Sequence, residues 1–249
     1  MRARRPTRIV SEHPHYDLGC LAQEVGQYRR AIAEYKREIR STDYYKAHHN
    51  LGTIWLERRR YDDAIRTFLA AIRRCRGLAD GHNNLGVAYS RIGQYQKAVR
   101  SYARASRLNP RDPRPLANLG FTLTRIGRYR EAVAALRRAL RLDPSNLEVL
   151  HTLGVILIDK DLAVREGVSF LEVARRRVRR DAQLLADLAA GYLKLGRIVR
   201  AHSVLQTASG LRSANQRVRV QIRRLQRLAR ATREARATSV LELPRFGGG

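Results

Sequence analysis

The sequence predicts an all-α fold, a right-handed superhelix (α-solenoid) of about six helix–turn–helix units followed by a basic C-terminal capping helix. Three observations support this prediction. A Leu-Gly pair recurs every 34 residues, beginning at residues 51, 85, 119 and 153. Within each unit, apolar and small residues return at intervals of three and four, which is the spacing of one helix face. A glycine marks the turn between the two helices of four units, at Gly26, Gly93, Gly127 and Gly196.

The same period divides the chain into segments. We expect a basic N-terminal arm at residues 1–11, a repeat array at 12–214, an arginine-rich capping helix at 215–237 and an extended tail at 238–249. The six repeats are expected at residues 12–44, 45–78, 79–112, 113–146, 147–181 and 182–214. A stack of repeats leaves its last apolar face uncovered. The apolar stripe of the last helix suits that place, with Val218, Ile222, Leu225 and Ala229.

Small residues also recur in the second half of each unit. They form one series, at Ala31, Ala64, Ala98, Ala132, Gly167 and Ala201. An aromatic residue or a leucine follows each of them by four residues. Small side chains here and at the Leu-Gly pair allow the paired helices to approach closely, whereas a larger one would push them apart. The fifth unit, which has Gly167 in this series, is expected to have a lengthened turn.

Leu, Gly, Tyr, Ala, an aromatic residue, Ala and Pro at these intervals resemble the tetratricopeptide repeat, over roughly residues 12–214. The resemblance implies stacked helix pairs whose first helices line a concave groove that holds a peptide or protein segment. The groove candidates are residues on either side of each Leu-Gly pair and one turn beyond it. They are Asn50, Asn83, Asn84, Asn118, Thr53, Val87, Phe121, Arg91 and Arg125.

Asparagines directly precede three of the Leu-Gly pairs, at Asn50, Asn84 and Asn118. In some tetratricopeptide proteins, asparagines at this place form a ladder that bonds to the backbone of an extended peptide. An amide suits that task because it both donates and accepts hydrogen bonds. The alternative is that asparagine is merely tolerated there. The series ends after the fourth repeat, with Thr152 and Asp187, so a ladder would be limited to the middle repeats.

An asparagine directly after the pair, with basic residues nearby, would indicate the dicarboxylate clamp that captures acidic chaperone tails in this family. Thr53, Val87 and Phe121 occupy three of those places, so the clamp is absent as a pattern. Instead, the valine and phenylalanine are expected to give the groove an apolar floor. Arg91 and Arg125 follow one turn later, and the expected groove is therefore mixed in charge rather than strongly basic.

The formal net charge of the chain is +28, from 50 basic and 22 acidic residues. Such an excess predicts attraction to RNA or the ribosome, to an acidic protein subunit, or to an anionic membrane surface. The candidate polyanion contacts are five arginines at one equivalent place on successive second helices and five on the capping helix. They are Arg40, Arg73, Arg107, Arg141, Arg176, Arg217, Arg223, Arg224, Arg227 and Arg230. The alternative is that these cations only complement helix dipoles and keep the surface soluble.

Motifs of catalysis and cofactor binding are missing from the sequence. It contains no glycine-rich phosphate loop, no nucleophile elbow and no paired metal-binding histidines on a helix, so no enzyme activity, metal or cofactor is expected. No run of about 18 apolar residues occurs, so no membrane span is expected. Cys20 and Cys75 are far apart, as suits reduced thiols, and without a signal peptide the expected location is cytoplasmic.

The leading hypothesis is a non-enzymatic interaction scaffold or adaptor. It binds a peptide or protein segment in its groove, as an assembly or structural subunit of a larger anionic complex. The alternative hypothesis is a protein that binds RNA or the ribosome non-specifically through its basic outer surface and C-terminal helix. Peripheral contact with an anionic membrane is a third hypothesis. The sequence identifies no particular partner.

Overall fold

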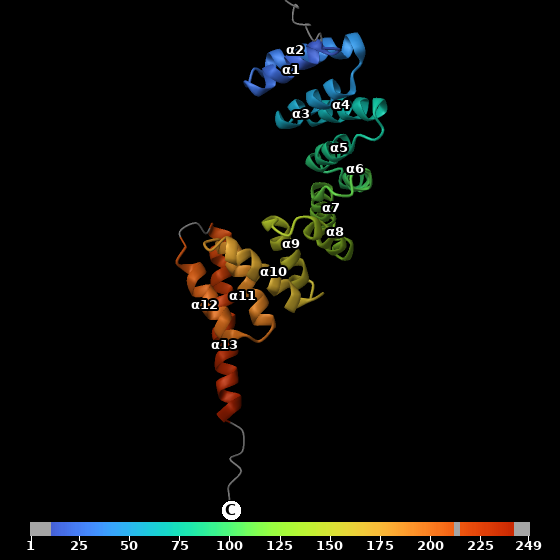
Figure 1. Ribbon diagram of the computed structural model, residues 1–249. Coiled ribbons are helices and arrows are strands. Elements are labelled where there is room, and N and C mark those ends of the chain that lie inside the picture. Colours follow the sequence, from blue (N-terminus) through green and yellow to red (C-terminus); the bar gives the residue numbers. More distant parts are fainter. Residues whose placement is uncertain (1–10, 212–214, 242–249) are drawn as a thin grey trace, which may run out of the picture. The chain divides into compact units, whose positions relative to one another are not determined.

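The computed structural model of the chain describes residues 11–211 and 215–241, which form α-helices joined by turns, without a strand among them (Figure 1). The all-α class expected from the sequence is confirmed. Most of the expected N-terminal arm lies outside the described residues, as does the expected tail from residue 242 onward. The chain divides into two compact units, Met1–Arg128 and Tyr129–Gly249, which are described separately.

Unit 1 is a stack of helix pairs followed by one further helix. Its helices are α1 (Pro14–Glu24), α2 (Tyr28–Thr42), α3 (Tyr45–Glu57), α4 (Tyr61–Arg74), α5 (Ala79–Arg91), α6 (Tyr95–Leu108) and α7 (Pro113–Arg125). The pairs are α1 with α2, α3 with α4 and α5 with α6, and they are stacked through contacts of α2 with α3, α4 with α5 and α6 with α7. In Figure 1, α3 and α5 lie on one side of this stack, and α4 and α6 lie on the other.

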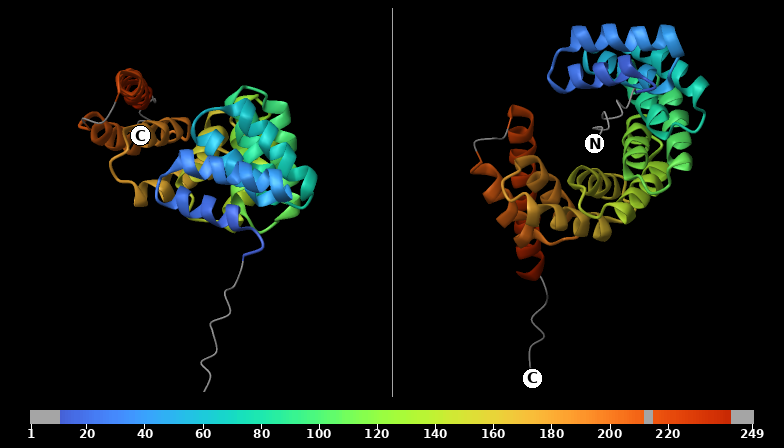
Figure 2. Two further views of the ribbon diagram at one scale, coloured as in Figure 1. Left: turned by 90° about the horizontal axis from the view of Figure 1, so that it is seen from above. Right: turned by 45° about the horizontal axis from the view of Figure 1, so that its top comes forward.

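Unit 2 is also built from antiparallel helix pairs. Its helices are α8 (Tyr129–Leu142), α9 (Leu147–Asp159), α10 (Val164–Arg177), α11 (Ala182–Lys194), α12 (Ile198–Ser209) and α13 (Gln216–Leu241). Helix α9 pairs with α10 and α11 with α12, while α13 packs against both α11 and α12 (Figure 2). Helix α13 continues through residues 238–241, which the sequence assigns to the extended tail, so the regular helix is longer than expected.

The recurring Leu-Gly pair is explained by contact between paired helices. A Cβ atom placed on Gly86 would lie 2.7 Å from the ring of Tyr102, and one on Gly52 would lie 2.7 Å from the ring of Phe68. Both rings are fully or almost fully buried, so they have little room to move aside. The glycine of the first helix and the aromatic residue of the second are therefore one packing unit, repeated along the stack.

The fifth expected repeat departs from this pattern because its helices come even closer. A Cβ atom on Gly167 would lie 2.7 Å from the carbonyl oxygen of Gly154, so alanine does not fit where the other units have it. The turn between α9 and α10 spans residues 160–163, whereas that between α5 and α6 spans residues 92–94. The turn is therefore lengthened by one residue, as expected from the sequence.

The turns between paired helices need one residue in the left-handed conformation. Gly93 has a φ of 77° and Gly196 a φ of 68°, a region that glycine enters without steric cost. At the equivalent places Arg59 and Asp161 adopt φ values of 58° and 52°. The left-handed turn is thus kept in repeats that have no glycine there. We attribute this to the packing of the two helices that the turn connects.

The capping helix α13 is attached by an apolar stripe and by a polar network. Val218 and Ile222 are buried in unit 2. Asp187 of α11 accepts a hydrogen bond of 3.0 Å from the amide of Gln221 on α13. The same carboxylate lies 2.9 Å from the Nε2 atom of His151 on α9. The Asp187 carboxylate therefore connects α9, α11 and α13 and helps to position the capping helix.

Two carboxylates of α2 are buried beneath the start of α1. Glu38 is fully buried, and its Oε1 atom lies 2.7 Å from the Nδ1 atom of His13. Glu34 lies 2.8 Å from the Nδ1 atom of His15 in the same way. The ring of His13 also stacks on Tyr44, with centroids 3.6 Å apart. These contacts join the first residues of α1 to α2 and to the start of α3.

Replacing Gly86 by alanine is expected to destabilise the protein. The added methyl group would press against the buried Tyr102 ring, and overpacking of this kind costs about 1–3 kcal/mol. Denaturant titration followed by circular dichroism measures the change. Gly77→Ala is the matched control, because nothing lies within 4 Å of that position, and it should change stability by less than about 0.5 kcal/mol. Equal effects of the two substitutions would contradict this packing account.

Glu38 is expected to make stability fall in acid. Burial alone raises the pKa of this carboxyl, but hydrogen bonds from Thr42, His13 and the backbone N–H of Tyr16 outweigh it and hold the pKa below the ordinary value of 4.5. A carboxyl whose pKa is lowered by folding stabilises the protein above its unfolded pKa, and this contribution is lost as the pH falls through the folded value.

Stability measured from pH 6 down to pH 3 should therefore fall more steeply in the wild type than in Glu38→Gln. The exposed Glu57→Gln substitution serves as the matched control and should leave the wild-type profile unchanged. If Glu38→Gln follows the wild-type profile throughout the acid limb, the hydrogen bonds to this carboxylate are not the source of the pH dependence.

Candidate functional site

Unit 1 contains a cavity of about 630 Å³ on the side formed by the first helices of its pairs. Eleven residues line it, most of them polar. They are Cys20, Gln23, Glu24, Tyr28, Tyr35, His49, Asn50, Thr53, Asp80, Asn84 and Arg114. All but two of these residues belong to α1, α3, α5 and α7. Successive repeats of the stack, mainly through their first helices, therefore contribute side chains to the same cavity.

Amide side chains form a hydrogen-bonded chain beside this cavity. The amide nitrogen of Asn118 on α7 donates to the Oδ1 atom of Asn83 on α5, at 3.1 Å. Asn83 in turn donates to the Oδ1 atom of Asn84, at 3.3 Å. The amide nitrogen of Asn84 lies 3.3 Å from the Nε2 atom of His49 on α3. The chain thus crosses three successive first helices and fixes the orientation of each amide.

His49, the last member of this series of hydrogen bonds, has a neutral imidazole. Burial lowers the pKa of its imidazole, more than the neighbouring Asn50 and Asp80 raise it. A neutral imidazole can accept a hydrogen bond at Nε2, which matches the position of the Asn84 amide. The histidine therefore orients the amide rather than presenting a positive charge to the cavity.

A second set of hydrogen bonds organises the end of the cavity near α1. The hydroxyl of Tyr35 donates to the Oε1 atom of Gln23 at 2.9 Å, and the amide of Asn50 donates to the same hydroxyl at 3.2 Å. Burial raises the pKa of Tyr35, so its hydroxyl stays protonated and can serve as donor and acceptor together. The Asn50 amide also donates to the Sγ atom of Cys20, at 3.5 Å, so both of its N–H groups have partners within the protein.

Arg114 forms two ion pairs at the opposite end of the cavity. A guanidinium nitrogen of Arg114 lies 2.9 Å from Asp80 and 2.7 Å from Asp112, the N-cap of α7. Burial raises the pKa of Asp112, but the hydrogen bonds that Arg114 donates to it lower the pKa by more. The net pKa is below the ordinary value, so the carboxylate stays ionised. With Glu24 also in the lining, the cavity carries both signs of charge, although Arg91 and Arg125, on which the sequence prediction of a mixed groove rested, are not among its residues.

The expected groove residues fall into separate groups in the structure. Asn50, Asn84 and Thr53 line the cavity. Asn83 is buried, with 6% of its surface exposed, and lies between α5 and α7 with Asn118 instead of facing the hollow.

The four remaining candidates do not line the cavity. Val87 and Phe121 are half-buried, so the floor is polar where an apolar one was expected. Arg91 and Arg125 are exposed, and the guanidinium of Arg125 lies 5.6 Å from the ring centroid of Tyr95.

The sequence contains a signal for one feature that was not singled out. Asp80 and Arg114 are 34 residues apart and open successive first helices, so the period places them side by side. Gln23 and Tyr35 had no such signal, because both lie in the first repeat, which is out of register, and Tyr35 also occupies an ordinary packing position.

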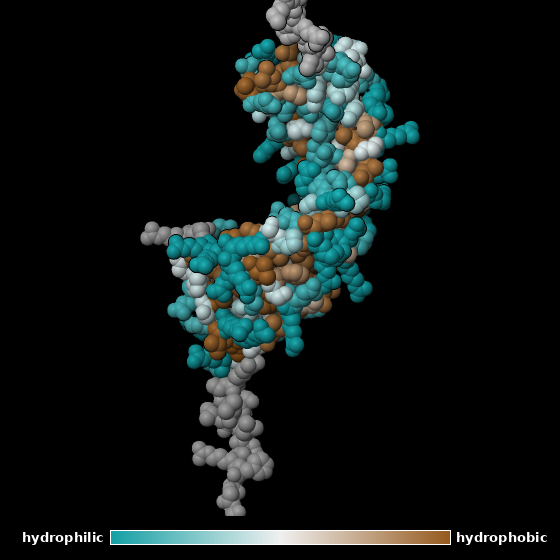
Figure 3. Space-filling model, viewed as in Figure 1, coloured by the Kyte–Doolittle hydropathy of each residue, from teal (hydrophilic) through white to brown (hydrophobic). Residues whose placement is uncertain are grey.

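The ten arginines proposed as polyanion contacts are all exposed. In unit 1, Arg40, Arg73 and Arg107 occupy the last turns of α2, α4 and α6, and in unit 2 Arg141 and Arg176 occupy those of α8 and α10. Within the described part of the chain, none of the ten has an ion-pair partner. Figure 3 shows a mainly hydrophilic surface on the face of each unit in view.

Residues 11–211 and 215–241 contain neither a candidate metal site nor a candidate membrane-spanning helix. No group of three or more histidine, cysteine, aspartate or glutamate side chains there could hold a metal ion. No helix of these residues is both long and apolar enough to cross a membrane.

The fold has counterparts among solved structures. The crystal structure of MamA matches with a TM-score of 0.62 and 21% identity, over 66% of this chain and 95% of that one. The crystal structure of YrrB, described as a TPR protein with an unusual peptide-binding site, matches with a TM-score of 0.68 and 15% identity, over 76% and 97%. A second MamA structure gives a TM-score of 0.61, 21% identity and coverage of 68% and 92%. No curated protein matches the chain.

The family described as the cilia and flagella-associated protein 70 C-terminal domain, a set of tetratricopeptide repeats, matches residues 5–161. That match spans more than half of the chain and includes all the helices that line the cavity of unit 1. Together with the 34-residue period and the paired helices, it shows that the chain belongs to this tetratricopeptide repeat family.

Proposed function

We propose that the chain is a non-enzymatic scaffold that binds an extended peptide segment of a partner protein in the cavity of unit 1. The observation that carries the proposal is the pair of cavity-lining amides, Asn50 and Asn84, held by Tyr35 and His49. Held amides lose little conformational freedom when they bind, so their hydrogen bonds to a ligand are made at low entropic cost. YrrB, which shares the fold, is described as having a peptide-binding site.

The chemistry of the cavity suits a peptide backbone. Asn84 has a second N–H beyond the one directed at His49, and an amide oxygen has two lone pairs, so the two asparagines together can bond both kinds of backbone group. Helices α3 and α5 are first helices of adjacent pairs, and packed helices are about 10 Å apart. An extended chain rises about 3.3 Å per residue, so every third residue of a peptide would meet one amide. The ion pair of Asp80 and Arg114 favours a polar residue of the peptide at that end.

Removing both amides should weaken peptide binding without unfolding the protein. Peptides selected from a random displayed library against the full chain serve as probes, and their affinities are measured by fluorescence polarisation. The double variant Asn50→Ala, Asn84→Ala should bind at least about tenfold more weakly, since two hydrogen bonds at about 1 kcal/mol each are lost. Gln96→Ala, an exposed amide on α6 away from the cavity, is the control and should bind like the wild type.

Replacing Asn83 tests, in the same assay, whether a buried structural asparagine differs from the two cavity-lining asparagines. Its replacement by alanine should lower the free energy of unfolding by about 1–3 kcal/mol, because Asn118 loses its partner beside a buried position. Peptide affinity of the folded variant should change much less than in the double variant. Selected peptides whose binding ignores Asn50 and Asn84 would contradict the proposal.

A second candidate function is contact with a polyanion such as RNA, supported by the ten exposed arginines without ion-pair partners in the described residues. Binding of a single-stranded RNA oligonucleotide should weaken by at least about tenfold between 50 and 200 mM salt. Replacing Arg217, Arg223, Arg224 and Arg227 by glutamine should flatten that dependence. Affinity that is flat with salt in the wild type would rule out phosphate contacts as its basis.

A further inference from the structure

A second cavity lies in unit 2, between the first turn of α12 and the last part of α13. Its volume is about 780 Å³. Residues 196–200 and His202 form one wall, and Ala229, Arg230 and Arg233 form the other. It involves none of the residues that line the cavity of unit 1. We refer to it as the α12–α13 groove.

The groove opens because the apolar stripe of α13 ends. Val218, Ile222 and Ala229 succeed one another along that stripe and are buried. The next positions at helical spacing are Thr232 and Arg233, which cannot continue an apolar contact. In Figure 1, α13 runs on past the ends of the helices that it covers. The helix therefore stays regular beyond the point at which it stops packing, and a gap is left beside α12.

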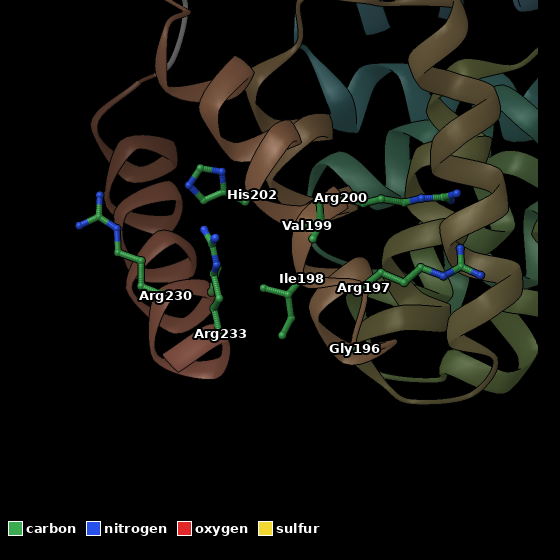
Figure 4. Close-up of a pocket in the computed structure, with 9 residues that line it drawn as sticks. Gly196, Arg197, Ile198, Val199, Arg200, His202, Arg230 and Arg233 are labelled. Atoms are coloured by element: carbon green, nitrogen blue, oxygen red, sulfur yellow. The ribbon is translucent and has the colours of Figure 1, made fainter. Parts of the chain in front are cut away.

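The floor of the groove is apolar. Ile198 points into the gap between the two helices (Figure 4). Ala229 of α13 also lines the groove, with 2% of its surface exposed. Val199 adds a large aliphatic side chain that is 84% exposed. Figure 3 shows apolar surface at this end of unit 2, with hydrophilic surface around it. A partner that covered this floor would gain free energy from burying it.

The walls of the groove are basic. Arg233 and His202 point toward one another across the gap (Figure 4). Arg230 extends along the outer side of α13, and Arg197 and Arg200 leave α12 on the side away from α13. None of the lining residues is acidic. Within the described residues these four arginines have no ion-pair partner. Arg233 inside the gap, the three arginines around its rim and the absence of a carboxylate from the lining give the groove a positive potential, which attracts a ligand with carboxylates.

We propose that the α12–α13 groove is a docking site for an acidic amphipathic helix of a partner protein. Such a helix supplies aliphatic side chains for the floor and carboxylates for the walls in one rigid element. A carboxylate beside the apolar face of the docked helix would meet Arg233 in the gap, and Arg230 adds a second positive charge at the outer rim, about 5 Å away along α13. Nucleic acid has no aliphatic side chains to cover Ile198 and Val199.

The test uses the full chain and a fluorescein-labelled synthetic peptide with leucines along one helical face and glutamates beside them. A scrambled peptide of identical composition is the ligand control. The wild type should bind the amphipathic peptide at least about tenfold more tightly than the scrambled one. Val199→Asp and Arg233→Glu should each lower that affinity by about tenfold, because they remove the apolar contact and a charge-assisted hydrogen bond.

Arg224→Glu makes the same charge change on the same helix at an exposed residue that does not line the groove, and it should weaken binding by less than about twofold. Circular dichroism verifies that each variant is folded, and Val199 and Arg224 are exposed enough that folding should be kept. The Asn50→Ala, Asn84→Ala variant should bind the peptide normally, which makes this site independent of the unit 1 cavity.

Several results would overturn the proposal. Equal losses in Arg224→Glu and Arg233→Glu would mean that net charge, not the groove, attracts the peptide. Equal binding of the scrambled peptide would mean that the apolar floor takes no part. An RNA oligonucleotide or vesicles of acidic lipid could also compete with the peptide. If they compete equally well in the wild type and in Val199→Asp, the surface binds a polyanion or a membrane instead.

Discussion

The close approach of paired helices is the constraint on which the rest of this structure depends. In unit 1 it places a glycine on the first helix opposite a large buried side chain of the second helix, as with Gly86 and Tyr102. Because each such contact fixes one pair, the pairs repeat at the same spacing and present the same side of each first helix. The cavity of unit 1 is a consequence of that repetition. Its side chains come from separate repeats, yet they meet without any long-range segment to assemble them.

The chain uses this scaffold differently on its faces. In unit 1 the first helices present amides and an ion pair that are already hydrogen-bonded to one another, such as Asn84 to His49 and Arg114 to Asp80. In both units the ends of second helices present arginines with no ion-pair partner in the described residues. Where the stack of unit 2 ends, α13 covers the last apolar face and leaves the α12–α13 groove open. The hydrogen-bonded amides therefore lie on first helices, and these arginines lie at the ends of second helices.

Much of this fold could be predicted from the sequence because packing residues recur at a fixed period. The lining of the cavity was harder to predict, since neighbouring residues on a helix are 100° apart and a small rotation exchanges their roles. Asn83 and Asn84 illustrate this, because the first is buried between α5 and α7 and the second lines the cavity. Gln23 and Tyr35 were missed because both lie in the first repeat, which is out of register, and Tyr35 has the position of an ordinary packing residue. The extra length of α13 was missed because no glycine or proline stands near residue 237 to mark an end.

The central claim is that a peptide binds across the first helices of unit 1. Hydrogen–deuterium exchange of the full chain, with and without a selected peptide, tests it most directly, because the method locates binding without any substitution. The account predicts slower exchange in α3 and α5, at Tyr45–Glu57 and Ala79–Arg91, with little change in α13. Protection confined to the second helices or to unit 2, with α3 and α5 unchanged, would contradict it.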